Sequence, residues 1–169
     1  MEIETDRLLL RQFRQSDIDA YAKMVADEEA MHFIGGVGDR GEAWRRMAKW
    51  AGQWVLRGYG EFAVEEKSSG RFIGHIGPYY PEDWPQVELG WALARETWGK
   101  GYATEAARVC AAWMFDELSF PRIISIIHPD NAASIRVAQK LGERRDGVFN
   151  IKGEQVLIYA MTRSDFIRE

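Results

Sequence analysis

The chain has 169 residues, of which 46% are hydrophobic and 28% are charged, proportions that are typical of a globular domain. Its formal net charge of −4 does not favour a nucleic-acid partner, it contains no apolar run long enough to cross a bilayer, and its single cysteine excludes an internal disulfide. We therefore expect one cytoplasmic domain over residues 1–169, with no membrane association and no bound metal.

The N-terminal third predicts one strand and two helices. The stretch RLLLRQF, residues 7–13, has the composition of a strand, and Ser16 is expected to cap a helix over residues 17–27. A second helix is predicted over residues 42–56, where apolar side chains recur at helical spacing and two glycines follow. Trp50 lies off that apolar stripe, so we expect it to be the most exposed tryptophan of this helix.

Three consecutive strands are predicted next. Residues 60–67 and 71–80 are joined by the turn sequence Ser-Ser-Gly, which indicates a β-hairpin. Residues 86–93, with the sequence QVELGWAL, predict a third strand directly after the hairpin.

Glycines then flank a lysine immediately before a helix. In WGKGYATEAARVCAAWMF, residues 98–115, apolar residues recur at helical spacing from Ala103 onward, and Cys110 falls on that apolar face. A helix that starts here leaves its first backbone N–H groups unpaired and partially positive. Glycine lets such a backbone approach a ligand closely. The stretch therefore predicts a site for an anion, most naturally a phosphate.

The C-terminal third predicts three strands and one helix. A short apolar strand is expected over residues 122–128, a helix over 131–142 with Asn131 as its N-cap, and two closing strands near 144–149 and 154–162. The order of all these elements predicts an α/β fold of the mixed α+β kind. Its central mixed sheet would have about seven mostly antiparallel strands, one parallel crossover and helices on both faces.

Five motifs, in family order and spacing, resemble the GNAT superfamily of N-acetyltransferases, and within it the RimJ/RimL branch. They are ETDRLLLRQFRQSDIDAYAKMVAD, FIGHIG, VELGWALARETWGKGYATEAA, HPDNAASIRVAQKLG and LIYAMTRSDF. The resemblance implies the GNAT acyl-CoA N-acyltransferase fold and an enzyme that transfers acetyl from acetyl-CoA, its cosubstrate, directly to a primary amine. A protein N-terminal α-amine is the favoured acceptor. A small-molecule amine and a non-catalytic acyl-CoA-binding module are the alternatives, and we expect a monomer or homodimer.

The resemblance also implies which residues hold acetyl-CoA. The family signature Gln/Arg-x-x-Gly-x-Gly/Ala is matched by Gly101 and Ala103, although Trp98 stands at its first position. Neither the P-loop pattern nor the Rossmann glycine pattern fits this loop. The pantetheine arm is expected to pair with the backbone of the strand over residues 86–93. The implied cofactor-binding residues are Trp91, Ala92, Leu93, Trp98, Gly99, Lys100, Gly101, Tyr102, Ala103, Thr104, Asn131 and Ser134.

Glu88 and Ser134 are the implied catalytic residues. A glutamate at the place of Glu88 often acts as the general base in this family, directly or through water. A tyrosine acid is usual seven residues after the motif asparagine, but Ala138 occupies that position here. Ser134 is therefore expected to lie near the sulfur and to relay a proton to the leaving thiolate. His75 and His128 are expected to be structural.

Overall fold

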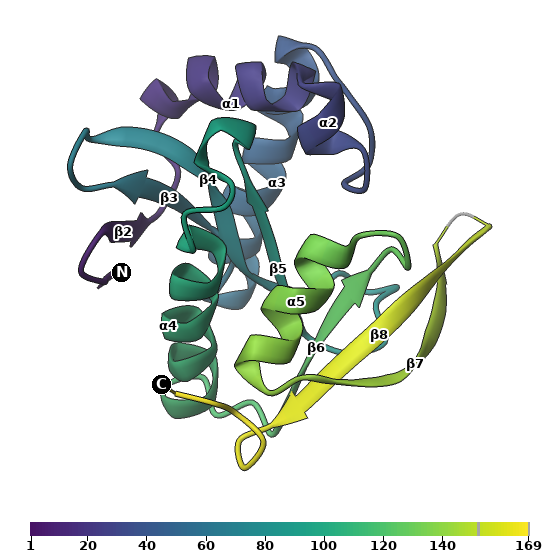
Figure 1. The fold of residues 1–169 in the computed structure, drawn as a ribbon. Helices are drawn as coiled ribbons and strands as arrows, with labels where there is room; N and C mark the ends of the chain where they lie inside the picture. Colours follow the sequence, from purple (N-terminus) through teal and green to yellow (C-terminus); the bar gives the residue numbers. More distant parts are fainter. Residues whose placement is uncertain (152, 169) are drawn as a thin grey trace.

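The computed structural model describes residues 1–151 and 153–168, and within them the chain forms one central sheet flanked by helices (Figure 1). The eight strands of this sheet lie in the order β1-β2-β3-β4-β5-β6-β8-β7. Their bounds are β1 (Glu2–Glu4), β2 (Leu8–Arg11), β3 (Phe62–Glu66), β4 (Arg71–Tyr79), β5 (Glu88–Leu93), β6 (Arg122–Ile127), β7 (Arg144–Ile151) and β8 (Glu154–Thr162). All neighbouring strands are antiparallel except β5 and β6, so the predicted fold class is confirmed.

The sheet has one strand more than the expected seven. The additional strand is β1, which pairs with β2 in the register Ile3↔Leu10. Its three residues, Glu-Ile-Glu, are too few to show a periodic pattern, which is why the sequence did not indicate it.

Five α-helices cover the two faces of the sheet in the described part of the chain. They are α1 (Ile18–Ala26), α2 (Glu28–Met31), α3 (Arg40–Arg57), α4 (Tyr102–Asp116) and α5 (Ala132–Leu141). Buried side chains of α1 and α3 form one core cluster, whereas α4 contributes most of its apolar face to a larger core on the opposite side. Cys110 lies in that larger core, fully buried as predicted. None of the helices among residues 1–151 and 153–168 has the length and hydrophobicity needed to span a membrane.

Two local predictions were wrong. Ser16 does not cap α1, because it lies inside a short 3₁₀ turn (Gln15–Asp17) that precedes the helix, and Asp17 closes that turn by accepting a hydrogen bond from the backbone of Arg14. Trp50 is buried with 6% of its surface exposed, whereas Trp44 is 55% exposed. The buried stripe of α3 runs through Ala43, Met47 and Trp50, at spacings of four and three residues.

Candidate active site

The backbone at the start of α4 presents a row of unpaired donors. The helix begins at Tyr102, and Gly101 precedes it in the left-handed conformation with φ 82°, which glycine adopts without strain. Within residues 1–151 and 153–168, the backbone N–H groups of residues 99–104 donate no hydrogen bond of normal geometry, and the first bond of the helix runs from Glu105 N to Gly101 O. These N–H groups form the positive end of the helix dipole, which suits an anion.

The N-terminal segment holds this loop in place. Arg7 donates from Nη1 to the carbonyl of Lys100 at 3.0 Å and from Nε to the carboxylate of Glu105 at 2.7 Å. Thr5 donates to the same carboxylate. The loop also has an anchor on β5, because Trp98 donates from its indole Nε1 to the carbonyl of Leu93 at 2.8 Å. The donors at the start of α4 are therefore fixed from two sides by side chains far apart in the sequence.

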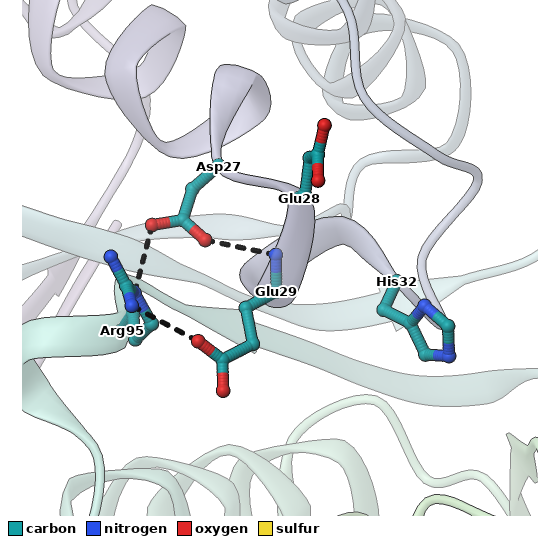
Figure 2. A pocket seen from close by; sticks show the side chains of 5 residues that line it. All are labelled: Asp27, Glu28, Glu29, His32 and Arg95. Carbon is teal, nitrogen blue, oxygen red and sulfur yellow. Dashed lines mark hydrogen bonds and ion pairs between the residues drawn. The ribbon is translucent and has the colours of Figure 1, made fainter.

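A pocket of about 720 Å³ opens beside the beginning of this loop. Figure 2 shows Arg95 within it, bonded to the carboxylates of Asp27 and Glu29 at 2.9 and 3.0 Å. Glu28 and His32 complete the lining. Because two acids already balance the charge of Arg95, the positive potential of the loop comes chiefly from its backbone and from Lys100.

The strands β5 and β6 separate next to this loop. They share a single parallel register pair, Glu88↔Ile124, with Ile124 N donating to Val87 O at 3.1 Å. Farther along, Ile126 N faces the carboxylate of Glu88 at 3.4 Å, and the hydroxyl of Ser125 donates to Leu89 O. These side-chain contacts stand where the next backbone hydrogen bonds of a parallel pair of strands would form. Beyond them β5 and β6 are not paired, and we call the space between these two strands the gap.

Part of the β5 backbone faces the widened gap without a partner in the described residues: both polar groups of Trp91 and the N–H of Leu93, whose carbonyl already accepts from Trp98. Ala94 N donates to Ile73 O on β4. The backbone N–H and C=O groups of every second residue before Ala94 therefore also point toward β4. The backbone groups of Trp91 and Leu93 consequently point to the other side, toward β6. An extended, amide-containing ligand in the gap could pair with them.

Glu88 lies at the narrow end of the gap. Its carboxylate accepts hydrogen bonds from the indole of Trp84 and from the backbone of Ile126. Burial raises the pKa of Glu88 to about 7; the bond from Trp84 opposes the shift and the charge of Glu61 adds to it. A carboxylate with this pKa can accept a proton near neutral pH.

Asn131 and Ser134 lie on the facing side, at the start of α5. Asn131 is the N-cap, as predicted, because its Oδ1 accepts from Ser134 N at 3.0 Å. The hydroxyl of Ser134 forms no hydrogen bond with any residue in the described ranges, and the side chain is partly exposed. It therefore remains free to bond a ligand.

Residues 7–144 match the family described as Acetyltransferase (GNAT) domain. The chain belongs to the GNAT acetyltransferase family. It is 34% identical over 150 residues to the uncharacterized N-acetyltransferase YnaD of Bacillus subtilis, a match that covers 88% of this chain and 86% of YnaD. The family assignment makes the protein an enzyme of the acetyl-CoA-dependent acyltransferase class.

Solved structures agree with the GNAT assignment. An acetyltransferase from Agrobacterium tumefaciens superposes with a TM-score of 0.87 at 30% identity, covering 96% of this chain and 95% of that one. The ribosomal L7/L12 α-N-protein acetyltransferase RimL, solved with coenzyme A, has a TM-score of 0.80, covers 96% of this chain and 98% of RimL, and is 18% identical. At that identity RimL shows a shared fold only, so the GNAT superfamily is confirmed while the RimJ/RimL branch stays a prediction.

The predicted site residues of this GNAT enzyme lie on the loop before α4 and the first turn of that helix, on β5 and at the start of α5. Two residues have side chains that are already engaged within the protein: Tyr102 donates to Glu66 at 2.8 Å, and Trp98 is bonded to Leu93. They could contact a cofactor through their backbone. His75 is buried beside Glu61, and His128 stacks on Phe33 with ring centroids 4.9 Å apart, so each has a structural contact.

A second buried carboxyl group, Glu143, was not suggested by the sequence. Ser125 Oγ lies 2.9 Å from Glu143 Oε1 and 2.9 Å from Leu89 O. A hydroxyl has one proton, so both bonds form at once only if Glu143 is protonated and donates to Ser125. Burial raises the pKa of Glu143 to about 8, which fits the protonated form, and the other oxygen, Oε2, is buried without a partner among the described residues. Protonated Glu143 thus stabilises the hydrogen bond between Ser125 of β6 and Leu89 of β5, which lies where these two strands separate.

We expect the variant Glu143→Gln to be more stable than the wild type above pH 8. The folded-state pKa of Glu143 exceeds that of an unfolded glutamate, so its stabilising effect is complete at acidic pH and is lost as pH rises through about 8. A glutamine amide keeps a donor toward Ser125 and never ionises. Unfolding in urea at pH 6 and pH 9 measures the difference, expected to be about 1–3 kcal/mol at pH 9. Equal pH dependence in the two proteins would contradict it, and Glu117→Gln, on the exposed end of α4, is the control.

Proposed function

We propose that this enzyme transfers the acetyl group of acetyl-CoA directly to a primary amine, with a protein N-terminal α-amine as the first candidate acceptor. The observation that carries the proposal is the set of unpaired N–H groups of residues 99–104 at the start of α4, which follows β5, the strand that shares a single register pair with β6. The donors suit the diphosphate of coenzyme A, and the backbone groups of Trp91 together with the N–H of Leu93 suit the amides of its pantetheine arm.

Acetyl-CoA supplies the activated acyl group, and the residues around the gap manage the protons. Glu88 accepts a proton from the attacking amine, directly or through a water molecule. The backbone N–H of Trp91 points into the gap, where it would stabilise the negative oxygen that forms when the amine attacks the thioester. Ser134 would relay a proton from a water molecule to the leaving thiolate, so that its own hydroxyl is restored.

A covalent acetyl-enzyme is not part of this mechanism. The only thiol, Cys110, is fully buried on α4, and burial raises its pKa, so its reactive thiolate form is disfavoured. Direct transfer needs the amine and the thioester to be held together in the gap, which is where Glu88 and the backbone of β5 meet.

The proposal is tested by measuring the release of free thiol from acetyl-CoA with a panel of acceptors. We expect release with peptides that have free N-termini. Release only with polyamines, amino acids or aminoglycosides would replace the peptide acceptor by a small amine. Tight coenzyme A binding without release for any acceptor would contradict the enzymatic proposal and favour a binding module.

A further inference from the structure

The carboxylate of Glu61 approaches that of Glu88 above the sheet, although Glu61 precedes β3 and β4 lies between β3 and β5. The register Phe62↔Ile76 places Gly77 opposite Glu61, and Gly77 in turn pairs with Gly90 on β5. Glu61, Gly77 and Gly90 therefore form one row across three strands. Alternate residues of a strand share a face, so this row lies on the face that also presents Glu88.

Two of the three residues in this row are glycines, so no side chain from them fills the space above the sheet. A Cβ atom on Gly77 would lie 2.6 Å from Glu61 Cα, so a side chain there would displace Glu61. A Cβ on Gly90 would lie 3.4 Å from Glu61 Oε1 and 3.9 Å from Glu88 Oε1. Both carboxylates consequently border the same small space above Gly90, next to the gap between β5 and β6.

Glu61 is held firmly but retains one free oxygen. Its side chain is only 4% exposed, Oε2 is hydrogen-bonded to His75 Nδ1, and its backbone carbonyl accepts from the indole of Trp54 at 2.9 Å. Oε1, the atom that faces Gly90, has no hydrogen-bond donor among residues 1–151 and 153–168. Oε1 is not among the fully buried side-chain atoms without a partner in the described residues, so it keeps some contact with solvent and can accept a hydrogen bond from a ligand.

Aromatic rings around this space favour a cation as that ligand. Trp50 lies 5.4 Å from Tyr79 and 5.4 Å from His75, measured between ring centroids. The side-chain ammonium of Lys49 lies over the rings of Trp50 and Tyr79, with Nζ 3.7 and 4.8 Å from the two ring centroids. Such contacts between a cation and aromatic faces are attractive. The chain therefore already accommodates one primary amine at the edge of this cluster.

We infer that Glu61 binds the ammonium group of the acceptor through Oε1 and holds it above Gly90, within reach of Glu88. His75 acts as a positioning residue, because its bond to Oε2 fixes the orientation in which Oε1 faces the acceptor. The inference rests on the proposed function, and it adds a residue for acceptor recognition that is separate from the cofactor site and from the base.

The first test is the variant Glu61→Gln, which keeps the shape of the side chain and removes its charge. We expect the KM of the acceptor amine to rise about tenfold or more, since a hydrogen bond to a charged group is lost. The KM of acetyl-CoA and the affinity for coenzyme A should stay at wild-type values. A purely structural role for Glu61 would lower the unfolding temperature without this selective change in acceptor KM.

The second test does not disturb the bond between Glu61 and His75. Gly90→Ala adds one methyl group to the space between the two carboxylates, at a position whose backbone needs no left-handed conformation. We expect a similar rise in acceptor KM with unchanged coenzyme A affinity. Gly52→Ala in α3, where an added Cβ meets no atom within 4 Å, is the control and should match the wild type.

The outcomes separate this inference from the proposed function. Selective increases in acceptor KM in both variants would support Glu61 as an acceptor-binding residue. Wild-type acceptor KM in Gly90→Ala, with the protein folded, would overturn the inference even if Glu61→Gln failed to fold. Absence of thiol release from the wild-type protein itself would contradict the proposed function as well as the inference.

Discussion

Replacing Glu88 by glutamine is expected to reduce kcat by about 10²–10⁴-fold, the usual contribution of a general base. Glutamine keeps an oxygen that can accept the hydrogen bond from Trp84, so the fold and the shape of the gap should be retained. The affinity for coenzyme A should not change, because the proposed contacts with its diphosphate lie at the start of α4. Steady-state kinetics together with calorimetry of coenzyme A binding measure both quantities.

The pH dependence provides a second readout for Glu88. The base is active when its carboxyl group is ionised, and its pKa is raised to about 7. The kcat of the wild type should therefore rise with pH through about 7 and level off above it, whereas Glu88→Gln should lack this rise. A variant that retains wild-type kcat, or a wild-type profile that is flat between about pH 6 and 8, would remove Glu88 as the base.

The second large effect is expected for Thr104→Asp, which adds a negative charge to the first turn of α4. A carboxylate at a helix N-terminus stabilises the helix by about 0.3–1 kcal/mol, so the free protein should unfold at the same temperature or slightly higher. The same charge repels a diphosphate bound to the neighbouring N–H groups. We expect the Kd of coenzyme A to increase about 10–100-fold, or about 1.4–2.8 kcal/mol.

Thr104→Asn is the matched control, because asparagine has nearly the shape of aspartate without its charge. Its affinity for coenzyme A should stay within a few-fold of the wild type. If the aspartate variant bound coenzyme A as tightly as the asparagine variant, the anion would not lie at this helix terminus. The opposite signs expected for stability and affinity make a general folding defect easy to recognise.

Most of the fold could be predicted because its elements carry strong local signals. The glycine-flanked start of α4, the Ser-Ser-Gly turn and the N-cap Asn131 each have a direct physical cause in the neighbouring residues. The strand β1 is too short to have a pattern. The exposure of Trp50 was predicted wrongly because the buried face of α3 runs through Ala43, Met47 and Trp50 and leaves Trp44 exposed.

The candidate site was predicted less completely than the fold. Glu88 and the loop at residues 98–104 were indicated by motifs, whereas Glu61 and Glu143 have no sequence signal. Glu61 reaches Gly90 only through the register of three strands, and Glu143 meets Ser125 only after α5 has packed on the sheet. Long-range pairing of this kind is not encoded in the spacing of neighbouring residues.

The central claim is that the backbone N–H groups of residues 99–104 bind the diphosphate of coenzyme A. Titrating coenzyme A into the ¹⁵N-labelled protein and following its amide resonances tests this most directly. We expect the amides of Gly99, Gly101 and Ala103 to be among those with the largest downfield shifts, as new hydrogen bonds to phosphate oxygens form. Amide resonances of residues 99–104 that stay in place while coenzyme A binds elsewhere, or does not bind, would contradict the claim.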